Sequence, residues 1–186
     1  MGYVEIPKIQ VNLPIYHGTD AEVLDRGVGH LLGSSLPVGG ESTHTILSDH
    51  SGMASQKMFT DLEQLTQGDV FYLNVLNETL AYQVTEINTV LPYETDLLGI
   101  VPGEDLCTLV TCTPYGINTH RLLVRGRRVE TPDQYKHLRV TAEALKIEPI
   151  IVAPIMALPM LLILLIGMLL STRKPKKTRG EEHEKH

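Results

Sequence analysis

The stretch Thr108–Arg128 (TLVTCTPYGINTHRLLVRGRR) constrains the fold of this chain more than any other. It holds two β-favouring runs joined by a turn, Thr113–Thr119, that is rich in Pro, Gly and Asn. Such a pattern predicts two antiparallel strands with a long connection. Cys112 then ends the first strand and Arg121 begins the second, so a thiol and a fixed cation lie at the same end of a sheet. A cation close to a cysteine favours the thiolate, which is the nucleophilic form.

Short runs typical of strands also occupy most of the sequence before this stretch. The five that we predict as strands are Tyr3–Gln10, Val11–Tyr16, Thr43–Ser48, Asp69–Leu76 and Leu80–Val90. Helical turns are expected at Ala21–Arg26 (capped by Asp20), in Met58–Leu65, and at Asp96–Ile100 within the long connection Leu91–Asp105. Strands do not alternate with long helices, so the pattern indicates a mostly β fold, either a barrel or a sandwich.

The C-terminal part of the sequence predicts a membrane span. Residues 150–170 are 21 residues without a charge, about 31 Å as a helix, which fits the ~30 Å hydrocarbon layer. Five cations follow at once, at Arg173, Lys174, Lys176, Lys177 and Arg179. The positive-inside rule therefore predicts a cytoplasmic C-terminus and an extracellular folded part. We expect a catalytic domain at 1–130, a helical linker at 131–149, the transmembrane helix at 150–170 and a basic tail at 171–186.

Charge and cysteine content exclude several classes of function. Residues 1–148 carry 10 Lys and Arg against 19 Asp and Glu, a net charge of −9, which argues against nucleic acid as a partner. Cys107 and Cys112 would stand roughly 16 Å apart along one strand, too far for a disulfide, so Cys107 is expected to be a buried filler. No second cysteine pair or histidine pair has the spacing of a zinc site, and we expect neither metal nor cofactor.

The motif TLVTC, followed nine residues later by Arg121, resembles the TLxTC…R signature of the sortases. The longer run TPYGINTHRLLVRG resembles the pilus-building class C sortases, and YVEIPKIQVNLPIYHG resembles the opening strands of the sortase barrel. The resemblance covers about Tyr3 to Arg128 and implies a closed eight-stranded β-barrel with short helices. The export segment and the lid with an Asp-Pro-aromatic anchor, which are usual in class C, are absent before Tyr3. An open groove is therefore expected.

A thiol nucleophile needs a histidine nearby, and two candidates stand out. His50 follows a β-run, sits in a turn, and precedes Cys112 by 62 residues, a separation like that in the class C enzymes. His120 is close to Cys112 in sequence, but the family has no catalytic histidine there. The neighbours of His50 differ from the family, which commonly has Gly or Ala before this histidine and Arg after it; here they are Asp49 and Ser51. An adjacent carboxylate could favour the imidazolium form.

The resemblance implies a cysteine transpeptidase in which Cys112 is the nucleophile, His50 the proton donor, and Arg121 the group that holds substrate and stabilises the oxyanion. Its substrates would be pilin subunits with an LPXTG-like sorting signal, joined through the Thr carboxyl to a lysine amine of a second pilin. Alternatives are a housekeeping sortase that attaches surface proteins to peptidoglycan, or a non-catalytic module that binds sorting signals. Arg125, Arg127 and Arg128 are expected to form surface ion pairs. Thr111 is a candidate for shaping the oxyanion site.

Overall fold

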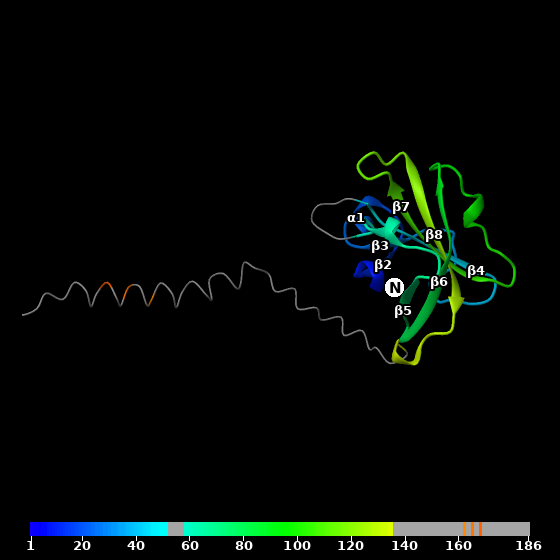
Figure 1. The fold of residues 1–186 in the computed structure, drawn as a ribbon, viewed down its shortest axis with the longest axis horizontal. Coiled ribbons are helices and arrows are strands. Elements are labelled where there is room, and N and C mark those ends of the chain that lie inside the picture. Colours follow the sequence, from blue (N-terminus) through cyan, green and yellow to red (C-terminus); the bar gives the residue numbers. More distant parts are fainter. Residues whose placement is uncertain (52–57, 136–161, 163–164, 166–167, 169–186) are drawn as a thin grey trace, which may run out of the picture. The chain divides into compact units, whose positions relative to one another are not determined.

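The computed structural model describes residues 1–51, 58–135, 162, 165 and 168. The chain divides into two units, Met1–Val140 and Thr141–His186. The described part of the first unit contains eight strands and one short α-helix, α1 (Ala21–Leu24), drawn in Figure 1. The strands are β1 (Gly2–Ile6), β2 (Val11–His17), β3 (Val28–His30), β4 (Thr43–Ser48), β5 (Val70–Val75), β6 (Glu78–Val90), β7 (Asp105–Thr113) and β8 (His120–Val129). Four 3₁₀ turns connect them, η1 (Pro7–Ile9), η2 (Leu62–Gln64), η3 (Asp96–Leu98) and η4 (Asp133–Tyr135).

The strands close into a barrel in the order β1-β2-β3-β4-β7-β8-β6-β5, so the predicted eight-stranded β-barrel is confirmed. Most neighbours are antiparallel, but β2 pairs with β3, and β4 with β7, in parallel. The parallel β4–β7 pair joins segments that are far apart in the sequence. It brings the end of β4 beside the end of β7, next to the β7–β8 hairpin.

Alternation along the strands separates an inner from an outer face of the barrel. On β7 the core residues are Cys107 and Leu109, and on β8 they are Leu122 and Val124. Gly126 belongs to the same inner row, since a Cβ there would lie 2.6 Å from the ring of Phe71. Cys112 and Arg121 occupy alternate positions to this inner row, and their side chains therefore face outward.

Three local features differ from the sequence prediction. Pro7 ends the first strand, because it lacks an amide hydrogen for the ladder, and η1 takes over the segment expected as the end of Tyr3–Gln10. The short strand β3 was not predicted, since it is three residues long and its side-chain pattern carries no period. The sequence predicts a turn at Asn77-Glu78 between β5 and β6, but the observed turn is Leu76–Asn77, one residue earlier. Both residues have positive φ, as a two-residue hairpin requires.

The expected C-terminal segments lie largely outside the described residues. The linker 131–149 is described only to residue 135, where η4 forms. Of the expected span at 150–170, the described residues are Leu162, Leu165 and Met168, which are helical and exposed. Over the described residues, none of the helices has both the length and the hydropathy needed to cross a membrane.

Candidate active site

The parallel ladder between β4 and β7 determines which residues meet at the end of the barrel. Thr43 lies opposite Asp105 and Ser48 opposite Val110, a constant offset of 62 residues. The Asp49 amide continues the ladder by donating to the Val110 carbonyl at 3.1 Å. Continuing the offset places His50 beside Cys112. The 62 residues that separate His50 from Cys112 in the sequence therefore equal the offset between paired residues in this ladder.

On the other side of β7, the hairpin register places Cys112 directly opposite Arg121. Arg121 is in turn paired with Val90 at the end of β6. Residues opposite one another in a sheet have their side chains on the same face. His50, Cys112 and Arg121 thus lie in one row across three neighbouring segments, on the outer face, and all three are partly exposed.

The competing histidine lies on the other face of the sheet. His120 is opposite Thr113, one position along from the pair Cys112 and Arg121. Since neighbouring positions in a strand point to opposite faces, the side chain of His120 is directed away from that of Cys112. Its Nδ1 contacts the hydroxyl of Thr119 at 2.9 Å. The geometry therefore favours His50 as the partner of the thiol.

The turn that carries His50 is bound to β7 by side chains as well as by the backbone. The Thr111 hydroxyl donates to the Asp49 carbonyl at 2.9 Å, and the Ser51 hydroxyl donates to the Cys112 carbonyl at 2.7 Å. The side chain of Thr111 is buried and faces inward. Its hydroxyl therefore holds the His50 turn, and its expected part in shaping an oxyanion site stays a prediction.

Asp49 lies beneath this row rather than within it. It is 2% exposed, and its Oδ1 accepts a hydrogen bond from the His50 amide at 2.7 Å. Burial raises the pKa of this carboxyl to about 7, and the bond from the His50 amide acts in the opposite direction. The contact that Asp49 makes with His50 is therefore with its main-chain amide.

The arginines of β8 serve different purposes. The Nη1 of Arg121 donates to the carbonyls of Asn118 (3.3 Å) and His120 (3.1 Å), both in the segment that precedes it. Arg125 pairs with Glu86, and Arg127 with Glu104, which confirms the expected ion pairs for these two. Arg121 forms none of the ion pairs found over the described residues, so its charge is available at the site.

The long connection between β6 and β7 is fastened to the same outer face. Arg125 donates to the Leu97 carbonyl at 2.6 Å, and His44 contacts the Gly99 carbonyl through Nδ1 at 2.8 Å. Burial lowers the pKa of His44, with a further contribution from the charge of Arg125. The carbonyl can only accept, so Nδ1 carries the proton, and Nε2 of the neutral ring accepts from the Thr108 hydroxyl at 2.7 Å. These anchors were not predicted, because only the register shows which loop crosses β4 and β8.

Exposed apolar side chains lie in the two connections that adjoin the row, β6–β7 and β7–β8. Tyr115 and Ile117 follow Cys112 in the β7–β8 connection and are 63% and 67% exposed. Tyr93, three residues after the end of β6, is 77% exposed, and Ile100 and Val101 are also exposed in that connection. Large apolar groups around a thiol and a guanidinium suit a peptide substrate with apolar side chains.

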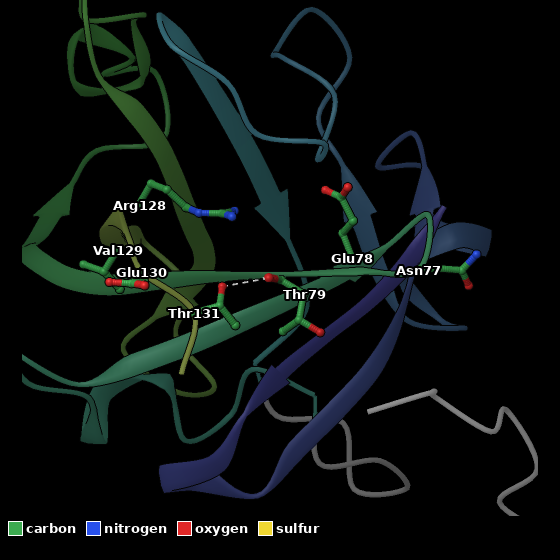
Figure 2. A pocket seen from close by; sticks show the side chains of 7 residues that line it. All are labelled: Asn77, Glu78, Thr79, Arg128, Val129, Glu130 and Thr131. Carbon is green, nitrogen blue, oxygen red and sulfur yellow. Dashed lines mark hydrogen bonds between the residues drawn. The ribbon is translucent and has the colours of Figure 1, made fainter. Parts of the chain in front are cut away.

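An open pocket lies at the other end of β8, far along the strand from Arg121 (Figure 2). Its lining is polar and includes Glu78, Arg128 and Glu130. Arg128 lies over the ring of Tyr82, 5.7 Å from its centroid, and its Nη1 is buried without a hydrogen-bond partner among the described residues. The expected surface ion pair of Arg128 is therefore wrong. Nothing in this pocket resembles the chemistry gathered around Cys112.

Comparison with known proteins identifies the family. A family model described as a sortase domain matches residues 4–129. Sortase A of Streptococcus agalactiae is 31% identical over 70% of this chain, and Sortase D of Bacillus subtilis is 31% identical over 69% of it. The chain spans 53% and 63% of the lengths of these two relatives.

Solved structures give higher identities. Sortase C-1 of Actinomyces oris is 58% identical with a TM-score of 0.69, over 70% of this chain and 72% of that one. Sortase C1 of Streptococcus agalactiae is 57% identical with a TM-score of 0.70, over 71% and 68%. A sortase C of Streptococcus pneumoniae, described for its catalysis and pilin substrate specificity, is 52% identical with a TM-score of 0.69, over 70% and 68%. The barrel, the site and these similarities agree: the chain belongs to the sortase family of cysteine transpeptidases, and within it to the class C sortases.

Proposed function

We propose that this chain cleaves an LPXTG-like sorting signal of pilin subunits and joins the Thr carboxyl to a lysine amine of a second pilin. The observation that carries the proposal is the outer-face row of His50, Cys112 and Arg121. It combines a nucleophile, a proton donor and a fixed cation at one end of a barrel whose rim is apolar.

The chemistry follows from the positions of the three side chains. The Cys112 thiolate attacks the Thr carbonyl carbon, and Arg121 stabilises the oxyanion of the tetrahedral intermediate. The Thr–Gly bond breaks as the imidazolium of His50 gives its proton to the leaving amine. A lysine amine of the second pilin then attacks the thioester. Its proton passes to His50, and the Cys112 thiolate leaves, which restores the starting state.

Support for a pilin substrate comes from the similarity to class C sortases, one of which is described for pilin substrate specificity. The apolar residues around the site, among them Tyr93, Tyr115 and Ile117, suit the Leu and Pro of such a signal. No cofactor is needed for either acyl transfer.

The lysine acceptor can be tested with purified protein. A pilin fragment that ends in an LPXTG-like signal is incubated with either a lysine-bearing pilin domain or an amine of the peptidoglycan cross-bridge. We expect mass spectrometry to find an isopeptide with the lysine, and no product with Cys112→Ala. A product with the cross-bridge amine alone would indicate a housekeeping sortase. Failure to trap any thioester on Cys112 would indicate a binding module.

We also propose that residues 150–170 anchor the protein in the cell membrane, with the barrel outside and the C-terminus in the cytoplasm. The uncharged run and the five cations after it support this orientation. In intact cells that express the chain behind an export signal, added protease should digest the barrel and spare an epitope placed after Gly180. A protected barrel would reverse the orientation.

A further inference from the structure

The turn that carries His50 is held from both sides by side chains of its immediate neighbours. Before His50, the Asp49 carboxyl accepts a hydrogen bond from the His50 amide at 2.7 Å. After it, the Ser51 hydroxyl donates to the carbonyl of Cys112 at 2.7 Å. The ladder of β4 and β7 has ended here, so these contacts fix the turn where regular pairing no longer does.

The contact made by Asp49 is costly for the fold. The carboxyl is 2% exposed, and its Oδ2 has no hydrogen-bond partner among the described residues. Burying a carboxyl with one oxygen unpaired destabilises a protein, so a well-packed apolar or small residue would serve stability better at this position. A local cost of this kind, directly under a reactive row, is typical of a group that serves function.

We propose that Asp49 and Ser51 are positioning residues that together hold the His50 imidazole at its working distance from the Cys112 thiol. Asp49 fixes the main chain of His50 through its amide. Ser51 ties the following residue to the strand end that bears the nucleophile. This inference rests on the proposed roles of His50 and Cys112.

The titratable groups on the described elements beside Asp49 can be named one by one. On its own segment the neighbour is His50, and on β7 the residues alongside are Thr111 and Cys112. On the opposite side, β3 contributes Val28 and Gly29, which do not titrate, and His30, which lies opposite Leu47. The segment that returns to the turn does so through Phe59, whose amide donates to the His50 carbonyl at 3.2 Å.

The proton on Asp49 gives a stability readout that is independent of catalysis. Its folded-state pKa of about 7 lies above its ordinary value of 3.8, so between these pH values the folded chain keeps a proton that the unfolded chain releases. Stability from this group therefore falls as the pH rises from about 4 to about 7, and is constant above. Asp49→Asn removes the dependence, so its Tm should rise relative to wild type across that window. A constant Tm difference would show a solvated carboxyl and overturn the role of Asp49.

The positioning role is tested by cleavage of an LPXTG-like peptide and by alkylation of Cys112. Asp49→Ala and Ser51→Ala should each lower kcat about 10-fold, and the double variant about 10²-fold, with KM nearly unchanged. Asp49→Asn and Ser51→Thr keep the acceptor and the hydroxyl, and should restore most of kcat. Alkylation by iodoacetamide at pH 6 should be several-fold slower in the double variant, because the imidazole is no longer held beside the thiol.

Thr131→Val is the matched control. The Thr131 hydroxyl also donates to a main-chain carbonyl, that of Thr79, at 2.8 Å, but beyond the far end of β8 (Figure 2). The Thr131→Val variant should have a lower Tm than wild type, with kcat and the alkylation rate of Cys112 unchanged. Alkylation needs no substrate, so its rate reports the effect of the turn on Cys112 even if the proposed pilin reaction is wrong. Wild-type kcat and alkylation in the double variant, measured well below its Tm, would overturn the proposal.

Discussion

Replacing Cys112 by alanine is expected to abolish cleavage of an LPXTG-like peptide, while Cys107→Ala should leave kcat/KM within about 2-fold of wild type. The two cysteines are on the same strand and differ in every property that matters for reactivity. Cys112 is partly exposed on the outer face, opposite Arg121. Cys107 is fully buried in the core, and burial raises the pKa of its thiol well above the ordinary value.

The comparison is made by peptide cleavage at matched concentrations of folded protein. Cys107→Ala removes a buried sulfur and is expected to cost about 1 kcal/mol of stability, so its assay temperature should lie well below its Tm. Mass spectrometry of the wild-type protein should find the acyl group on Cys112. Equal loss of cleavage in the two variants would mean that Cys112 is not the nucleophile.

The second large effect is expected from the other two members of the row. His50→Ala and Arg121→Ala should each lower kcat/KM by at least ~10²-fold, the scale of a lost proton donor or oxyanion contact. In the proposed mechanism His50 acts on the leaving amine, so its replacement should affect kcat more than KM. Arg121 is expected to contact the substrate backbone as well, so its replacement should affect both constants.

His120→Ala is the matched control for His50, because its side chain faces away from Cys112. It should reduce kcat/KM far less than His50→Ala. Arg127→Ala serves the same purpose for Arg121, since Arg127 is paired with Glu104 at the opposite end of β8. A larger loss of kcat/KM in His120→Ala than in His50→Ala would mean that His50 is not the proton donor.

Much of the site could be predicted from the sequence because its parts lie on strands with strong local patterns. β4 was predicted with its observed bounds, and the turn after it contains His50. The β7–β8 hairpin placed Cys112 and Arg121 together through a single connection. The choice of a barrel over a sandwich came from the resemblance, since alternation alone describes the faces of a strand and not the closure of a sheet.

What could not be predicted depends on pairing between distant segments. The parallel ladder that places His50 beside Cys112 cannot be recognised from the sequence pattern of β4 or of β7 alone. The burial of Asp49 follows from which face of β4 turns inward, and the turn residues alone do not show that face. The anchoring of Leu97 and Gly99 by Arg125 and His44 likewise depends on a connection folding across two strands that are remote in sequence.

The parallel β4–β7 pair also determines when the site can exist during folding. A hairpin such as β7–β8 closes locally, so Cys112 and Arg121 can meet early. His50 reaches Cys112 only after a 62-residue segment has been closed into a loop, at a cost in chain entropy that local contacts do not repay. We therefore expect His50 to join Cys112 late, when the barrel is nearly complete, so that a partly folded chain carries the thiol without the histidine beside it.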